Sequence, residues 1–244
     1  MTTFLSLRTA RTTSLRLARR TLFGLLALAA MPASAQAWPP LALPPDANAF
    51  GLGETLVANG TPMRVQVFVS ARSPDALAGW FRQQLGAPLV ESTFQNKLVL
   101  GRQIGEYYQT VELEAFALGT RGLAAVSHLK AAQQNHADTQ ASLGRWLARM
   151  PAGTQVAMDL RSQDGGKVAL YRVVVNTQTE ALNRERLSRL MADDGYTLER
   201  ASGPDENVLF FKGRGKEAMA TLRRDSDGRT SIVLNTVSDM ESFQ

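Results

Sequence analysis

An internal repeat is the feature that most constrains the fold of this chain. Residues 67–77, VFVSARSPDAL, align with residues 173–183, VVVNTQTEALN, at an offset of 106. In both stretches an alternating strand runs into a helix that follows a Ser or a Thr, residue types preferred as N-caps. A short strand and a tight turn precede each stretch, and three strands follow it. We therefore expect an α+β protein of two tandem ββαβββ modules, each an antiparallel sheet with one helix packed on a face, joined by an amphipathic helix.

The first module is expected at residues 51–132. Its strand at 63–70 alternates strictly, with Met and Val side chains on one face and Phe68 on the other. We expect the Met and Val face to pack against a helix that begins after Ser73 and ends at Gly86. Phe68 would then lie on the outer face of the sheet. This predicts that the outer face is covered by the linker helix, by the other module or by another protein.

The second module is expected at residues 153–238. Val156, Met158 and Leu160 alternate along its first strand and are expected to point towards the core. Thr179 is the expected N-cap of the helix in this module. Three strands with turns between them complete the predicted pattern.

A linker helix is expected between the modules, at residues 133–152. Its apolar residues have the i, i+3, i+4, i+7 spacing of one helix face, Asp138 or Thr139 is the expected N-cap, and Pro151 ends the helix. The polar residues 131–139 predict no regular element. The apolar face of the helix and the outward-facing aromatic ring form the candidate interaction surface, which comprises Phe68, Trp146, Leu143, Leu147 and Met150.

The N-terminal residues have the composition of a secretory signal peptide. Five Arg and no acidic residue precede an apolar run at 22–31, and residues 33–37 fit the small-x-small pattern of a signal peptidase site. A helix of about ten apolar residues is about 15 Å long, half of a ~30 Å bilayer core, and is too short to span it. We expect cleavage near Ala37. Arg19-Arg20, followed by Thr-Leu-Phe, resembles a twin-arginine export signal.

Cleavage would leave a periplasmic or secreted protein of bacterial type, without a stable membrane anchor. A proline-rich stretch, WPPLALPPDANAF, follows the expected cleavage site and predicts an extended arm. The expected parts of the chain are a signal peptide at 1–37, the arm at 38–50, the first module at 51–132, the linker helix at 133–152, the second module at 153–238 and a tail at 239–244.

Charge argues against nucleic acid as a partner. The full chain carries 27 Lys and Arg against 22 Asp and Glu, but cleavage would remove five Arg and leave 22 of each sign. A nucleic-acid-binding protein needs a surplus of basic residues to neutralise phosphates. The chain has no cysteine, so its fold must be stable without disulfides.

No motif of a catalytic, metal or phosphate site stands out. There is no Gly-x-Ser-x-Gly elbow, and the two-glycine stretches do not open helices as phosphate-binding loops do. His128 and His136 have no second ligand at metal spacing. Glu112 and Glu114 share one face of a strand, where carboxylates can act as acid and base but more often form a solvated surface. We expect no catalytic residue, no metal and no cofactor.

The leading hypothesis is therefore a non-enzymatic exported protein that binds envelope proteins or takes part in envelope assembly. Two alternatives remain open. One is a hydrolase of an envelope polymer that uses Glu112 or Glu114 together with His128. The other is a protein that binds a small molecule between the two modules. No protein family is similar enough for its functional residues to be transferred to this chain.

Overall fold

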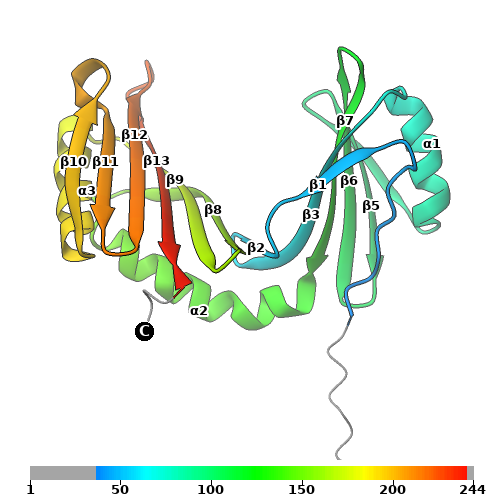
Figure 1. The fold of residues 1–244 in the computed structure, drawn as a ribbon, viewed down its shortest axis with the longest axis horizontal. Helices are drawn as coiled ribbons and strands as arrows, with labels where there is room; N and C mark the ends of the chain where they lie inside the picture. The colour runs from blue at the N-terminus through cyan, green and yellow to red at the C-terminus, as the bar shows by residue number, and fades with distance from the viewer. Residues whose placement is uncertain (1–36, 241–244) are drawn as a thin grey trace, which may run out of the picture. The chain divides into compact units, whose positions relative to one another are not determined.

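The structure, a computed structural model, describes residues 37–240. This part of the chain forms one antiparallel sheet of thirteen strands with three α-helices (Figure 1). The predicted α+β class is confirmed. The prediction of two separate sheets is wrong, because both halves of the chain belong to one sheet. The predicted signal peptide at 1–37 lies, except for Ala37, outside the described residues.

The elements form two series, which we call the first half (residues 38–128) and the second half (residues 148–240). Helix α2 (Leu129–Leu147) connects them. The first half contains β1 (Asn48–Gly51), β2 (Thr55–Ala58), β3 (Thr61–Ser70), α1 (Pro74–Leu85), β4 (Val90–Phe94), β5 (Lys97–Ile104), β6 (Tyr107–Phe116) and β7 (Gly119–His128). The second half contains β8 (Gln155–Asp164), β9 (Lys167–Asn176), α3 (Glu180–Asp193), β10 (Tyr196–Ser202), β11 (Val208–Gly213), β12 (Lys216–Arg224) and β13 (Thr230–Asp239).

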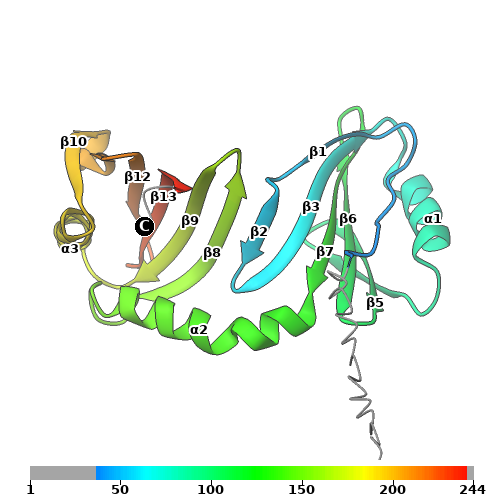
Figure 2. The ribbon, with the colours of Figure 1, turned by 60° about the horizontal axis from the view of Figure 1, so that its bottom comes forward.

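The two halves meet at the middle of the sheet, where β2 pairs with β8 (Figure 2). The strand order is β10-β11-β12-β13-β9-β8-β2-β3-β7-β6-β5-β4, and β1 pairs with β3. Counted outwards from the centre, the order is therefore equivalent in both halves. An edge strand presents unpaired N–H and C=O groups. Because β2 and β8 satisfy these groups for each other, the two predicted sheets join.

The junction has the register of a two-fold contact. Thr55 pairs with Gln163 and Val57 pairs with Arg161. At the offset of 106 found in the sequence, positions 55 and 57 correspond to 161 and 163. Each strand thus contacts the other through the same residues, as two subunits do across an isologous interface.

The turn before α1 and the turn before α3 make the same hydrogen bond. The Thr120 hydroxyl donates to the Arg72 carbonyl at 2.7 Å, and the Thr230 hydroxyl donates to the Gln178 carbonyl at 2.6 Å. Both threonines are fully buried. Arg72 and Gln178 are again 106 positions apart, so the repeat extends to particular contacts.

Each half has four strands after its helix, one more than the sequence predicts. The additional strands are β4 and β10, which form the two outer edges of the sheet. No residue of either strand is buried. Since neither strand contains a buried residue, neither shows the apolar alternation by which the other strands are recognised.

Helix α1 has the predicted ends and covers one face of the first half. The Ser73 side chain caps its first turn, and Gly86 follows its last residue with a positive φ of 68°. Its buried side packs on the sheet, where the rings of Phe68 and Phe81 lie 5.8 Å apart.

The predicted orientation of Phe68 is wrong. Phe68 faces helix α1 and is fully buried, whereas Val69, on the Met and Val face, is 40% exposed. Phe68 lies opposite Gly122 on β7, and a Cβ at position 122 would overlap the ring. The missing side chain on β7 thus makes room for the ring beneath the helix.

Helix α3 covers the second half in the same way, with Thr179 as its N-cap as predicted. Its buried residues pack on β9, β11, β12 and β13. The prediction that Met158 points towards the core is wrong, because the β8–β9 register shifts between Val156 and Met158. Val156 packs against the core of the second half, but Met158 is 40% exposed.

Helix α2 begins earlier than predicted. The His128 side chain accepts a hydrogen bond from the Ala131 N–H at 3.1 Å and so acts as the N-cap in place of Asp138 or Thr139. Residues 131–139, predicted to be irregular, are helical. No residue of α2 is buried. Among the described residues, no helix combines the length and the apolar character that crossing a membrane would need.

Candidate functional site

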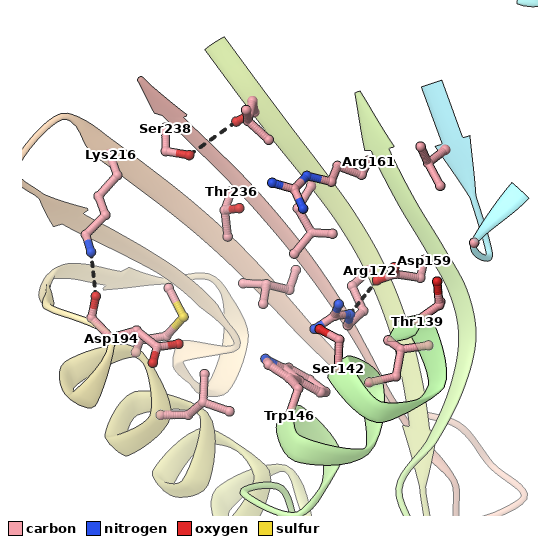
Figure 3. A pocket seen from close by; sticks show the side chains of 18 of the residues that line it. Thr139, Ser142, Trp146, Asp159, Arg161, Arg172, Asp194, Lys216, Thr236 and Ser238 are labelled. Atoms are coloured by element: carbon pink, nitrogen blue, oxygen red, sulfur yellow. Dashed lines mark hydrogen bonds and ion pairs between the residues drawn. The ribbon is translucent and has the colours of Figure 1, made fainter. Parts of the chain in front are cut away.

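A cleft of about 760 Å³ lies on the second half, between helix α2 and the sheet (Figure 3). Its floor is the part of β8, β9, β12 and β13 that α3 leaves uncovered. The end of α3 and the start of β10 form one side, and Val57 and Gly60 of the β2–β3 hairpin border it on the other. The cleft is thus built mainly from the second half and from the helix that connects the halves.

One face of helix α2 forms a wall of the cleft. Six residues contribute to it at helical spacing: Asn135, Asp138, Thr139, Ser142, Leu143 and Trp146. They change from polar at the N-terminal end of the wall to apolar at the C-terminal end. The predicted interaction residues Leu143 and Trp146 therefore line the cleft.

A charged pair is built into the floor beneath Trp146. Arg172 on β9 is 8% exposed, and its Nε lies 2.6 Å from Asp159 Oδ1 on β8. The guanidinium carbon of Arg172 also lies 4.5 Å from the centre of the Trp146 ring. The Arg fork is thus held by a carboxylate and by the face of an aromatic ring, which fixes the position of that ring.

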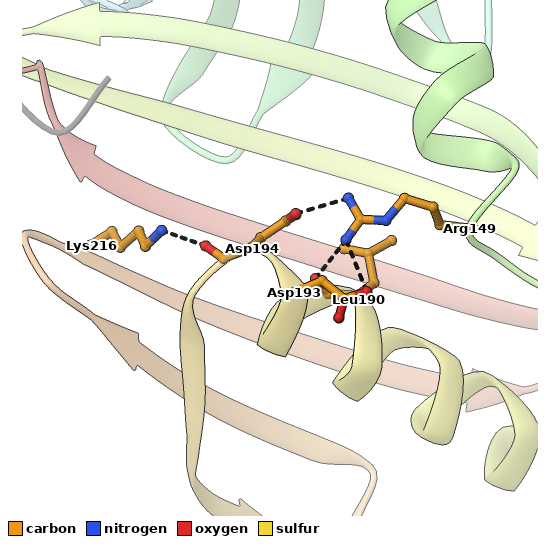
Figure 4. A network of polar contacts seen from close by, with 5 residues as sticks. All are labelled: Arg149, Leu190, Asp193, Asp194 and Lys216. Atoms are coloured by element: carbon orange, nitrogen blue, oxygen red, sulfur yellow. Dashed lines mark hydrogen bonds and ion pairs between the residues drawn. The ribbon is translucent and has the colours of Figure 1, made fainter. Parts of the chain in front are cut away.

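Polar contacts at the end of α3 form the opposite side (Figure 4). The Lys216 ammonium donates to the Asp194 carbonyl and lies 4.6 Å from the centre of the Tyr196 ring. Arg149 donates to the Asp194 carboxylate at 2.8 Å and to the Leu190 carbonyl at 2.9 Å. Carbonyls at the end of a helix have no partner within the helix, and the cations supply one.

Tyr196, at the start of β10, has a raised pKa. Burial raises the pKa of Tyr196 above its ordinary value of 10.0, and the negative charge of Asp194 raises it further. A hydrogen bond with Thr236 acts in the opposite direction. Tyr196 therefore stays neutral throughout the physiological pH range.

The charges of the cleft are balanced. Arg161, Arg172 and Lys216 line it together with Asp138, Asp159 and Asp194. The remaining lining is largely apolar, with Val168, Leu170, Leu190, Met191 and Leu234 among its residues. Such a lining suits a ligand that is apolar and carries little net charge, because the charges of the cleft cancel and a charged ligand would lose its hydration without meeting a net counter-charge.

The other predicted interaction residues do not form a common surface. Met150 is buried in the core of the second half, and Leu147, three residues before it, is partly exposed. Phe68 belongs to the core of the first half. Arg172 is not among the residues predicted from the sequence. It is in phase with Val168, Leu170 and Val174 along an apolar strand, a pattern that indicates a buried charge with a partner.

Glu112, Glu114 and His128 do not come together. The two carboxylates share a face, as predicted, and lie in ion pairs with Lys97 at 3.3 Å and Arg121 at 2.7 Å. His128 is opposite Tyr107, about 17 Å along β6 from Glu112, and is on the other face of the sheet. The geometry gives no support to a hydrolase built on these residues.

Within residues 37–240, no group of three or more His, Cys, Asp or Glu side chains could hold a metal ion. No family model, curated protein or solved structure matches this chain. Its function must therefore be inferred from its own geometry.

Proposed function

We propose that this protein is an exported, non-enzymatic binding protein of the bacterial envelope, and that the cleft beneath α2 is its binding site for a partner protein. The observation that carries the proposal is the Trp146 ring, partly exposed in the cleft and held from below by Arg172. A Trp fixed in a partly apolar hollow is the kind of residue that contributes most binding energy at protein interfaces.

The polar groups of the cleft favour binding over catalysis. Arg172 has its carboxylate partner, and Lys216 has a carbonyl partner. Groups that are already paired hold the walls in place, whereas a catalytic acid or base must be able to reach a reacting atom. The expected signal peptide is consistent with a partner that resides in the envelope.

We further infer that each half is one copy of a ββαββββ module and that the chain is a fused pseudo-dimer. The equivalent strand order, the two-fold register at β2 and β8 and the repeated threonine hydrogen bonds support this inference. The modules share one sheet, so neither is expected to be a separate folding unit.

Photocrosslinking tests the binding site directly. A benzoylphenylalanine introduced at Ser142, inside the cleft, should give a crosslink to a protein when the full chain is expressed in its source bacterium. The matched control is Gln140, which is exposed on the same helix and does not line the cleft. Equal crosslinking from both positions, or none from either, would contradict the proposal.

A small molecule is the second candidate ligand, because 760 Å³ lies within the range of small-molecule sites, about 300–1,000 Å³. Native mass spectrometry of the purified protein distinguishes the two. A defined extra mass that disappears in a Ser142→Trp variant, which fills the cleft, would favour the small molecule.

A further inference from the structure

In the first half, the face that is equivalent to the cleft is occupied by the N-terminal arm, residues 38–47. The Trp38 ring lies 5.3 Å from the Tyr107 ring and 5.9 Å from the His128 ring, and the Arg64 guanidinium lies 5.2 Å from it. The Pro40 carbonyl accepts a hydrogen bond from Gln109 at 2.9 Å. Residues 41–47 of the arm continue along the edge of the core of the first half. The chain thus binds its own extended Trp-Pro-Pro segment on this face.

The strand registers locate the corresponding place in the second half. Ser70 opposite Thr120 corresponds to Asn176 opposite Thr230. Counting along the paired strands from these positions shows which residues correspond to the three that surround Trp38. They are Leu170 for Arg64, Ser238 for His128 and Lys216 for Tyr107.

All three of these residues line the cleft. The site of the Trp38 ring in the first half therefore corresponds to open space in the second half. Helix α2 explains the difference. Pro44 and Pro45 of the arm correspond to Met150 and Pro151 at the offset of 106, and Pro44 and Met150 are both buried.

From this shared point the two segments run differently. The six residues back to Trp38 extend over about 20 Å. The six residues before Met150 are mostly helical, and six helical residues cover only about 9 Å. The helix lies against β9 at Trp146 and Arg172 and then continues towards β3, which it also contacts. The Trp38 position, one residue pair further along β9, is left free.

We propose that the cleft binds an extended segment of an envelope protein in which an aromatic residue is followed by proline, in the place that Trp38-Pro39-Pro40 occupies in the first half. This proposal rests on the proposed function and names the partner's chemistry. Residues 38–45, WPPLALPP, contain no charged side chain, which matches the balanced charge of the cleft. Proline-rich segments also lose little conformational entropy on binding, because they are already extended.

A peptide of residues 38–49 is the probe. With a fluorescent label, the anisotropy of the peptide should rise when it binds to the protein that begins at Trp38. In this protein the tethered arm keeps the site in the first half occupied, so the peptide reports on the cleft. Leu170→Asp should weaken binding at least about tenfold, as expected for a residue under the aromatic anchor. Ser142→Trp, at an exposed position, should do the same by filling the cleft. Leu198→Asp, on the exposed edge strand β10, should leave the affinity unchanged, and a peptide with Ala in place of Trp should not bind.

The outcomes separate this proposal from the proposed function. A Ser142 crosslink to a partner segment that contains an aromatic residue and proline, together with peptide binding, supports both. A protein crosslink without peptide binding overturns the peptide chemistry alone. A crosslink to a second copy of this chain, or to a small molecule, also overturns the assignment. If neither the crosslink nor the peptide binding is found, both proposals fail.

Discussion

A swap of buried residues between the halves tests whether they share one packing plan. Phe68 and Gly122 form a cross-strand pair beneath α1, and Val174 and Ile232 form the corresponding pair beneath α3. Phe68, Val174 and Ile232 are each at most 1% exposed. The two pairs contain the same number of side-chain carbon atoms, but in the first half all of them are on one strand and in the second half they are shared almost equally.

The expected free energies follow from this geometry. Phe68→Val alone removes about four buried carbon groups at ~0.8 kcal/mol each and leaves a cavity, so it should destabilise the protein by about 3–4 kcal/mol. Gly122→Ile alone places atoms inside the Phe68 ring and should cost at least about 3 kcal/mol. The double variant conserves volume and should lose no more than about 1.5 kcal/mol.

Urea unfolding of the chain from residue 38 onwards, followed by circular dichroism, measures these values. If Gly122→Ile does not fold, Gly122→Ala replaces it as the variant that adds atoms next to the Phe68 ring. Its expected cost is about 1–3 kcal/mol. The expected coupling is larger than the ~0.5–3 kcal/mol usual for contacting residues. A double variant as unstable as the sum of its single variants would refute the shared packing plan.

Three further outcomes are expected in the same unfolding assay. Ser73→Ala and Thr179→Ala should each cost about 1 kcal/mol, because each removes the N-cap of its helix. Arg172→Met should cost about 2–4 kcal/mol by leaving its carboxylate partner on β8 unpaired and largely buried. A hydrogen bond from Ser70 and the charge of an arginine lower the pKa of Asp46 below 3.8, so its stabilising effect is present above pH 3.8 and is lost as the pH falls through the folded-state pKa. The stability difference between the wild type and Asp46→Asn should therefore shrink on acidification, and a constant difference would count against this contact.

Local signals in the sequence were sufficient for the helix ends that side chains determine. Ser73, Thr179 and Gly86 lie where capping preferences place them. The start of α2 was missed because its N-cap is a histidine at the end of a strand. Histidine is not among the preferred caps, and the polar residues after it resemble a loop when only their composition is considered.

The burial of Phe68 depends on which side of β3 the helix covers. Alternation correctly separated the two faces of β3, but the face with more apolar residues was not the one beneath α1. The face of β3 that carries Phe68 is polar at Arg64 and Gln66. At this end of the strand the face is covered by the N-terminal arm instead of α1. A face covered by two different segments has a mixed pattern, and its position relative to the core follows only from tertiary structure.

The pairing of β2 with β8, which joins the halves, could not be predicted from a local sequence pattern either. Residues 55–58 form the strand β2, as expected, and one edge of β2 pairs with β3. Its other edge pairs with β8, where Leu56 is opposite Ser162, 106 positions further along the chain. Backbone hydrogen bonds across this edge depend little on side chains, so no residue marks β2 as an interior strand.

The difference between two equivalent halves is the best guide to function in this chain. Buried pairs and turn hydrogen bonds occur at equivalent positions of both halves, but the face next to them differs between the halves. In the first half it is filled by the chain's own arm, and in the second it holds a buried Arg–Asp pair beside a Trp and an open cleft. A buried ion pair adds little stability over apolar residues of the same size, because both charges must be desolvated. The position of Arg172 corresponds to Gln66 in the first half, where no such pair is needed to hold the arm. Stability therefore does not account for the pair. The proposed binding function would account for it, because Arg172 contacts the Trp146 ring and holds it in place.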